Sequence, residues 1–167
     1  MDALVNQAAK ARYMFGGQAS VPMVVRTPHG GGISAGPQHS QCLEAWFAHV
    51  PGLKVVCPSN PADAYGLLKS AIRDPDPVVF VENKALYALK GEVADDAAAI
   101  PLGQARTARA GRDLTVVSYG ATVHKALRAA QALAADGIEA EVLDLRSIQP
   151  WDEQAVLASL KRTHRLL

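Results

Sequence analysis

Apolar residues recur along the chain at two spacings, and together they predict helices that alternate with short strands. Helical spacing runs from Leu4 to Phe15, with Asp2 as the expected cap and Gly16-Gly17 as the expected end. The elements expected next are a strand over 22–26, a helix over 41–50, a strand over 54–57, a helix starting at Asn60-Pro61 and a strand over 78–81. This order is typical of an α/β fold, in which helices cover a parallel sheet.

A second series of elements follows an irregular segment. Residues 83–110 contain no long periodic run, and 93–110 is expected to be a linker between a first domain over 1–92 and a second over 111–167. The second domain is predicted to contain a strand over 114–118, a helix capped by Thr122, a strand over 141–145, a helix capped by Asp152 and the start of a further strand over 165–167. Two complete strands are too few for a stable sheet, so we expect a fragment, or a partner that completes it.

Charge and composition argue against several classes of function. The 17 Lys and Arg side chains nearly cancel the 16 Asp and Glu side chains, so nucleic acid and anionic membranes are not expected partners. The apolar runs are too short for a transmembrane helix, and the first residues lack a secretory signal pattern. Cys42 and Cys57 lack metal-ligand spacing and are expected to be reduced thiols of a cytoplasmic or organelle-matrix protein.

The stretch 27–41 is the expected place for chemistry, because ligands of open parallel sheets bind beyond the carboxyl ends of the strands. Four glycines allow a ligand close to the backbone, and His29 and His39 bracket them. His39 is the candidate proton-transfer group, because imidazole titrates near neutral pH and the side chains of Gln38 and Ser40 could orient it. The remaining histidines fall on or near predicted helices and are expected at the surface or in packing roles: His49, His124 and His164.

The same stretch matches two hydrolase motifs. Residues 29–32 match an oxyanion-hole motif, and residues 32–36 match the nucleophile elbow around Ser34. In a hydrolase these motifs lie on different loops that face each other across the substrate, whereas here they share one glycine. An elbow also needs a strand directly before the serine and a helix directly after it. We therefore disfavour a serine hydrolase built from Ser34, Asp144 and His164.

Residues 38–56, QHSQCLEAWFAHVPGLKVV, form the most distinctive stretch of the sequence. Together with 6–17, 66–74 and 144–150, this stretch resembles β subunits of thiamine-diphosphate-dependent 2-oxoacid dehydrogenases, and the resemblance covers essentially the whole chain. It implies the later part of a transketolase-type pyrimidine-binding domain followed by the opening part of a transketolase-type carboxyl-terminal domain. Transketolases themselves usually carry an acidic-Gly-x-Thr-His run that is absent here.

The resemblance also implies an activity and a set of partners. In this family the β subunit surrounds the aminopyrimidine of thiamine diphosphate, while the α subunit of a heterotetramer holds the diphosphate and Mg²⁺. The reaction is decarboxylation of a 2-oxo acid such as pyruvate, or cleavage of acetoin, with acyl transfer to the lipoyl group of an acyltransferase core. His39 matches the family's active-site histidine. Both pyruvate-type and acetoin-type subunits fit residues 26–32, so the substrate stays open.

Two further implications concern groups around this site. The family's glutamate that activates the aminopyrimidine would lie before Met1, so this chain alone is expected to be inactive. Some β subunits hold a potassium ion, and the matching positions here are Met23, Ala71, Ile72, Asp74 and Asp76. The alternative to an enzyme subunit is a non-catalytic binding module that retains the fold.

Overall fold

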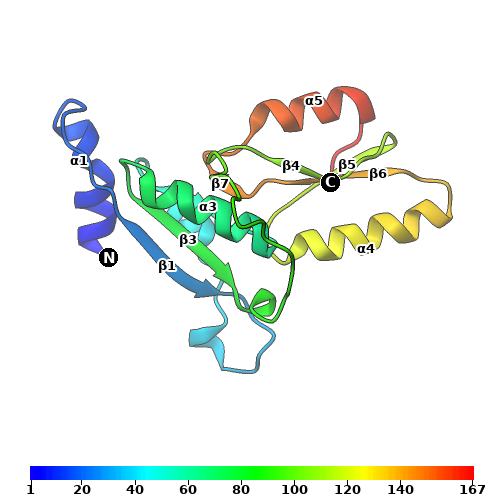
Figure 1. Cartoon of the computed structure of the whole chain (residues 1–167), viewed down its shortest axis with the longest axis horizontal. Helices are drawn as coiled ribbons and strands as arrows, with labels where there is room; N and C mark the ends of the chain where they lie inside the picture. Colours follow the sequence, from blue (N-terminus) through cyan, green and yellow to red (C-terminus); the bar gives the residue numbers. More distant parts are fainter.

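Two sheets with helices packed against them make up the computed structural model, which describes residues 1–167 (Figure 1). The first sheet has the order β1-β3-β2-β7, with β1 (Val24–His29), β3 (Val78–Asn83) and β2 (Lys54–Val56) parallel and β7 (Ser147–Gln149) antiparallel to β2. The second sheet has the order β4-β6-β5, with β5 (Leu114–Ser118) parallel to β6 (Ala140–Asp144) and β4 (Arg106–Arg109) antiparallel to β6. The predicted α/β class with mainly parallel sheets is confirmed.

The helices lie between and around these strands in the expected order. Their bounds are η1 (Ala3–Ala8), α1 (Ala9–Met14), η2 (Pro37–His39), α2 (Glu44–Ala48), α3 (Pro61–Arg73), η3 (Lys84–Leu86), α4 (Thr122–Ala135) and α5 (Glu153–Thr163). The start of α3 follows the predicted chemistry, because the Asn60 side chain accepts a hydrogen bond from the Asp63 backbone N–H at 2.9 Å. Asp152 caps α5 in the same way, through the N–H of Ala155 at 2.9 Å. No helix is long and apolar enough to cross a membrane.

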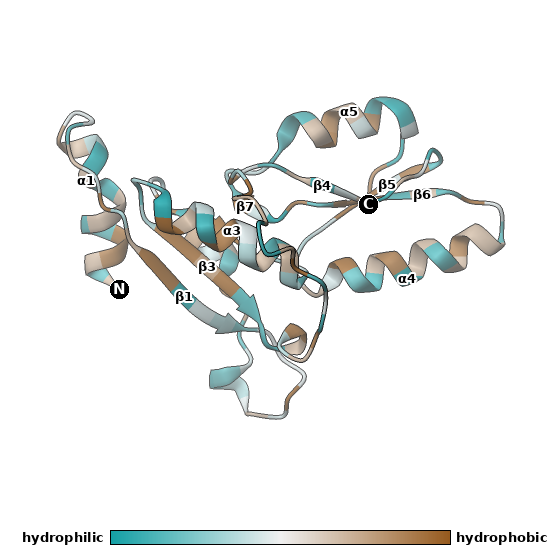
Figure 2. Cartoon of the chain, in the orientation of Figure 1, coloured by the Kyte–Doolittle hydropathy of each residue, from teal (hydrophilic) through white to brown (hydrophobic).

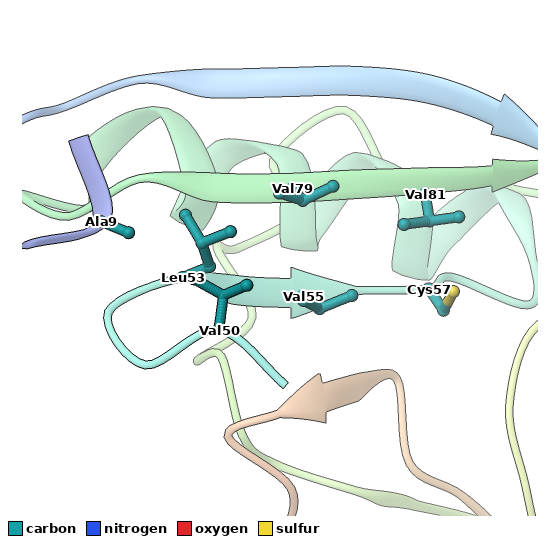
Figure 3. Packing of buried hydrophobic residues seen from close by; sticks show 7 residues of the cluster. All are labelled: Ala9, Val50, Leu53, Val55, Cys57, Val79 and Val81. Carbon is teal, nitrogen blue, oxygen red and sulfur yellow. The ribbon is translucent and has the colours of Figure 1, made fainter. Parts of the chain in front are cut away.

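The core of the first sheet lies on both faces of β3. Alternate residues of β3 point to opposite sides, so a strand that is apolar throughout is buried by two layers. One face packs on α3, through Val56, Leu67, Ala71, Val78 and Phe80. The other face packs on the segments around α1 and α2, and Figure 3 shows this cluster: Ala9, Val50, Leu53, Val55, Cys57, Val79 and Val81. The buried strand predicted over 78–81 is therefore confirmed.

The first helix differs from its prediction. It begins with π-type turns in η1, and the Asp2 carboxylate accepts hydrogen bonds from the side chains of Asn6 and Gln7 instead of capping the backbone. Phe15 is 63% exposed, and the residue that is buried is Ala9, which lies against the turn at Gly52. A Cβ at Gly52 would lie 1.8 Å from the Ala9 carbonyl oxygen, so this close approach decides which face is buried.

Two neighbouring boundaries also move. Strand β1 starts at Val24 and continues to His29, so the loop after it is shorter than the predicted stretch 27–41. The helix expected over 41–50 is regular only over Glu44–Ala48, where Phe47 packs on the core while Leu43 is 39% exposed. Both boundaries were predicted wrongly for the same reason. Tertiary contacts hold these residues in backbone conformations that the spacing of apolar residues does not indicate.

The second sheet is larger than its two predicted strands. Helices α4 and α5 lie on opposite sides of it (Figure 1). The chain end runs beside β5, where the Thr115 N–H donates to the Arg165 carbonyl at 2.8 Å and the Leu167 N–H donates to the Thr115 carbonyl at 2.9 Å. The extended segment expected over 165–167 is therefore present. Helix α4 starts at Thr122 rather than being capped by it, and the Thr122 hydroxyl donates to the Tyr119 carbonyl.

Two short strands lie where the sequence predicts no regular element. Strand β4 lies within the segment 93–110 expected as a linker, and its four residues are too few to produce a periodic signal. Strand β7 follows the second sheet in sequence but pairs with the first, with Val55 opposite Gln149 and Val56 opposite Ser147. This pairing ties the two halves of the chain together at the edge of β2.

Candidate active site

The loop after β1 is closed at its base by a single backbone hydrogen bond. The N–H of Gly30 donates to the carbonyl of Gln41 at 2.9 Å, which brings the end of β1 close to the start of α2. Gly30 has φ +92°, and a Cβ there would lie 3.0 Å from the Asn83 side-chain nitrogen at the end of β3. Glycine is needed at this position both for its backbone angle and for its close approach to β3.

His39 lies at the end of η2 within this loop. Its carbonyl oxygen accepts a hydrogen bond from the Lys84 ammonium, and its N–H donates to the carbonyl of Gly36. The Ser40 hydroxyl donates to the same carbonyl at 2.7 Å, so Ser40 stabilises the loop and does not orient the imidazole as expected. The backbone of His39 is thereby held, while its imidazole side chain is exposed.

His39 lines a cavity of about 440 Å³ at the carboxyl ends of β1 and β3, which are the hydrophilic ends of both strands in Figure 2. The cavity lies where the parallel-sheet argument places a ligand. Its wall combines apolar side chains with polar ones, namely Thr27, Pro28, His29, Ile33, Ala35, Gln38, His39, Gln41, Leu43, Glu44, Phe47, Val81 and Lys84. This mixture suits a flat, largely apolar ring that carries a few polar atoms.

A buried polar group forms the inner wall of this cavity. His29 and Glu44 are each 7% exposed, and His29 Nδ1 lies 3.2 Å from Glu44 Oε2. The Tyr119 hydroxyl, at the end of β5, lies 3.2 Å from the other oxygen of Glu44 and donates to it. Burial, together with the nearby Glu44 carboxylate, raises the pKa of Tyr119 from 10.0 to about 12, so the hydroxyl stays a protonated donor even at alkaline pH.

This buried group of His29, Glu44 and Tyr119 was not predicted from the sequence. Glu44 stands three residues before Phe47, on the face of α2 that packs inward. A carboxylate on the apolar face of a predicted helix could have marked Glu44 as a buried polar residue that needs a partner. Tyr119 could not be found in this way, because it reaches Glu44 from the second half of the chain, 75 residues away. His29 was noted at the start of the glycine-rich stretch and within a hydrolase motif, without a role of its own.

A second buried polar network joins the two halves of the chain. Asp63 at the start of α3 lies 2.8 Å from Arg146 Nη2 and 3.2 Å from Arg106 Nε. Asp144, fully buried at the end of β6, accepts from the Ser59 hydroxyl at 2.5 Å and from Arg106 Nη2 at 3.2 Å. Burial raises the pKa of Asp144, although Ser59 and Arg106 both favour its charged form. These hydrogen bonds and ion pairs connect the first sheet and its helix α3 to the second sheet.

The hydrolase arrangement is not formed. Ser34 is exposed, has φ +55° and lies between β1 and η2 with neither a strand directly before it nor a helix directly after it. Asp144 is engaged by Ser59 and Arg106, as described above. The arguments from sequence against a serine hydrolase are supported by this geometry.

The carboxylates at the implied potassium positions already face protein cations. Lys54 Nζ lies 2.7 Å from both carboxylate oxygens of Asp74 and 3.5 Å from Asp76, and Arg12 pairs with Asp76. The Lys54 ammonium therefore supplies these two carboxylates with the single positive charge that a potassium ion would carry.

The other implied positions add little to such a site. The Met23 carbonyl accepts from the Val78 N–H at 2.9 Å, the Ala71 carbonyl accepts from the Asp74 N–H at 3.3 Å, and Ile72 is 63% exposed. The Met23 and Ala71 carbonyls and the Asp74 and Asp76 carboxylates thus already face protein donors, and the potassium site stays a prediction.

Two family models match the chain. The transketolase pyrimidine-binding domain matches residues 1–90, and the transketolase C-terminal domain matches residues 103–167. The chain belongs to the family of proteins with transketolase-type pyrimidine-binding and C-terminal domains. The predicted architecture of a pyrimidine-binding domain followed by a carboxyl-terminal domain of this family is confirmed.

Solved structures with the same fold include transketolases. A split-gene transketolase described as an inactive beta4 tetramer has a TM-score of 0.80 and 24% identity, over 99% of this chain and 50% of that one. A transketolase mutant from Pichia stipitis has a TM-score of 0.68 and 23% identity, over 96% of this chain and 24% of that one. At this identity the likeness shows the fold of this transketolase-family chain.

Curated relatives are more similar in sequence and confirm the resemblance to dehydrogenase β subunits. Acetoin:2,6-dichlorophenolindophenol oxidoreductase subunit beta from Cupriavidus necator is 55% identical over 99% of this chain and 49% of the relative. Pyruvate dehydrogenase E1 component subunit beta-2, mitochondrial, from Oryza sativa is 51% identical over 100% and 46%. The 2-oxoisovalerate dehydrogenase subunit beta from Bacillus subtilis is 49% identical over 98% and 50%. The chain spans about half the length of these relatives.

Proposed function

We propose that this transketolase-family chain forms the part of a dehydrogenase β subunit that carries the active-site histidine loop. The substrate is pyruvate or acetoin, and the acyl group passes to a lipoyl acyltransferase. The observation that carries the proposal is the position of His39. It lines a cavity beyond the carboxyl ends of β1 and β3, in a chain 55% identical to an acetoin oxidoreductase β subunit.

The family implies thiamine diphosphate as cofactor, and the residues of the cavity fit one side of it. When bound, thiamine diphosphate supplies the carbanion that attacks the carbonyl carbon of the substrate. Ile33 and Leu43, which are both exposed, offer apolar surface to a flat ring, and the polar side chains of Gln38 and Gln41 line the same cavity. In this proposal an α subunit holds the diphosphate and Mg²⁺, in a heterotetramer. The bacterial and mitochondrial relatives favour the bacterial cytoplasm or the organelle matrix.

The role proposed for His39 is proton transfer to and from the reacting substrate. The loop holds its backbone through Lys84 and Gly36, while the imidazole is free to face the cavity. Imidazole is the side chain most often used for general acid–base catalysis, because its two ring nitrogens can release and take up a proton within one catalytic cycle. General acid–base groups of this kind contribute about 100-fold to 10,000-fold to a rate.

The test uses the full-length subunit that contains this chain, produced together with its α partner. We expect thiamine-diphosphate-dependent turnover of pyruvate or acetoin, and a fall in kcat of about 100-fold or more for His39→Ala. His49→Ala is the matched control, because His49 is exposed and lines no part of the cavity, so it should retain activity. Comparing pyruvate, acetoin and 2-oxoisovalerate identifies the substrate.

Two results would contradict the proposal. His39→Ala could retain full activity, which would remove the proposed proton transfer. The complex could also form with an α subunit yet turn over no 2-oxo acid or acetoin, which favours the alternative of a binding module. The 167-residue chain alone is expected to be inactive, and measurable decarboxylation by it would refute that expectation.

A further inference from the structure

Three side chains of the types that bind transition metals converge at the base of the His39 loop. They are His29 at the end of β1, Cys42 near the end of the loop and Glu44 at the start of α2. A ring nitrogen, the Cys42 sulfur and a carboxylate oxygen all lie within 4.8 Å of one another. The Gly30–Gln41 hydrogen bond brings these segments together, so the cluster is built by the loop closure.

Three polar atoms of this cluster are buried and lack hydrogen-bond partners. Neither Nδ1 nor Nε2 of His29 makes a hydrogen bond, and Oε2 of Glu44 makes none, while both residues are 7% exposed. The 3.2 Å contact between His29 Nδ1 and Glu44 Oε2 does not have the geometry of a hydrogen bond. Buried polar atoms are almost always satisfied, so unpaired ones indicate a missing ligand, ion or water.

An open space lies beside these atoms. A cavity of about 190 Å³ is lined by His29, Cys42 and Glu44, by Asn83, and by residues 117–122, which run from β5 into α4. The space is large enough for an ion with a water molecule. The Tyr119 hydroxyl beside this space donates a hydrogen bond to Glu44 Oε1 at 3.2 Å, which leaves Glu44 Oε2 free for an ion.

We propose that His29, Cys42 and Glu44 form a zinc-binding site. Imidazole nitrogen, thiolate sulfur and carboxylate oxygen are the three side-chain ligand types of Zn²⁺, and the mixture argues against Mg²⁺ and Ca²⁺, which take oxygen ligands. The Cys42 thiol releases its proton on binding, so a thiolate and a carboxylate together balance the two positive charges of the ion. A water molecule takes the fourth position.

The three ligand atoms need to move only slightly closer together to bind a zinc ion. Bonds of about 2.0–2.3 Å in a tetrahedron place neighbouring ligand atoms about 3.5 Å apart, and here they lie within 4.8 Å. Cys42 is exposed and stands in the loop, so its side chain can move inward, while His29 and Glu44 are held by the buried ends of β1 and α2. Zinc would fix the loop that carries His39. The inference stands on these three residues and does not depend on the proposed dehydrogenase function.

The experiment titrates the metal-free chain with Co²⁺, which replaces Zn²⁺ and absorbs light through its thiolate bond. We expect one equivalent to bind, with a sulfur-to-cobalt charge-transfer band that Zn²⁺ then abolishes. Cys42→Ser should remove the band, and His29→Gln and Glu44→Gln should each weaken Zn²⁺ binding at least tenfold. The matched control is His49→Gln, an exposed histidine outside the cluster, which should bind as the unchanged chain does.

A second measurement needs no variant and therefore does not depend on whether a variant folds. Zn²⁺ should slow alkylation of Cys42 by iodoacetamide in the folded chain at least tenfold, because a metal-bound thiolate is shielded. An alkylation rate unchanged by Zn²⁺, the absence of a thiolate band, or a band that persists in Cys42→Ser would each overturn the proposal. Equal loss of binding in His49→Gln would do the same.

Discussion

The network around Asp63 offers the sharpest test of what holds the two halves of the chain together. Asp63 is 2% exposed and pairs with Arg146, whose side chain is 12% exposed, and with Arg106, whose side chain is 35% exposed. Asp63→Ala would leave the Arg146 guanidinium buried without its carboxylate. Breaking a buried pair from one side costs about 3–5 kcal/mol, and we expect the Arg146 contact to dominate because Arg106 keeps access to water.

The measurement is urea unfolding followed by circular dichroism, in a double-mutant cycle. Asp63→Ala should lower the free energy of unfolding by about 3 kcal/mol or more. Combining it with Arg146→Met should cost less than the sum of the two single changes, since no unpaired charge then remains. Asp96→Ala is the control, because Asp96 is exposed and forms no ion pair, and it should change stability by less than about 0.5 kcal/mol.

Two outcomes would refute this reasoning. If Asp63→Ala unfolds at the same urea concentration as Asp96→Ala, the buried ion pairs do not stabilise the junction between the sheets. If the costs of Asp63→Ala and Arg146→Met simply add, the two side chains do not interact in the folded chain. The slope of the unfolding transition should stay constant, because a changed slope would mean either altered compactness of the unfolded chain or loss of the two-state transition.

Three further predictions follow from burial. Because the pKa of Tyr119 is raised from 10.0 to about 12 in the folded chain, the unfolded chain loses this proton first, and the free energy of unfolding should fall as pH rises from 10 to 12. Tyr119→Phe should reduce that fall, and an equal dependence on pH in the variant and the unchanged chain would contradict the prediction. Cys42 is exposed, whereas burial raises the pKa of Cys57, so a thiol reagent should label one cysteine in the folded chain and two in urea, and Cys42→Ser should leave none in the folded chain. Leu67→Ala removes a fully buried side chain and should cost about 2–5 kcal/mol in urea unfolding, whereas Leu157→Ala, at a position 46% exposed, should cost far less; equal costs would mean that the core around α3 is not packed as described.

Helices and strands whose bounds depend on neighbouring residues could be predicted well. Helix α3 begins at a capping asparagine followed by a proline, and α5 begins at a capping aspartate, so a few neighbouring residues decide where each helix starts. Strand β3 is apolar at consecutive positions, which only burial on both faces explains. The first helix was predicted less well, because its buried face depends on the distant turn at Gly52.

The residues of the candidate site likewise include some that could be predicted from neighbouring residues and some that could not. His39 could be found from its loop, since glycines, a strand before it and a helix after it are all close in sequence. The Glu44–Tyr119 contact and the ion pairs of Asp63 could not be found, because Tyr119 lies 75 residues from Glu44, and Arg106 and Arg146 lie 43 and 83 residues from Asp63. No periodicity or motif spans such a separation.

The sequence by itself determined the class of fold, the order of most elements and the loop that carries His39. Each of these depends on residues within about one element of each other, where hydrogen-bonding and steric preferences act directly. Only the tertiary structure decided that β7 completes the first sheet, that protein cations meet Asp74 and Asp76, and that His29, Cys42 and Glu44 converge. The physical reason is that these contacts depend on how the chain is packed in space, and local preferences do not specify the packing of segments that are distant in sequence.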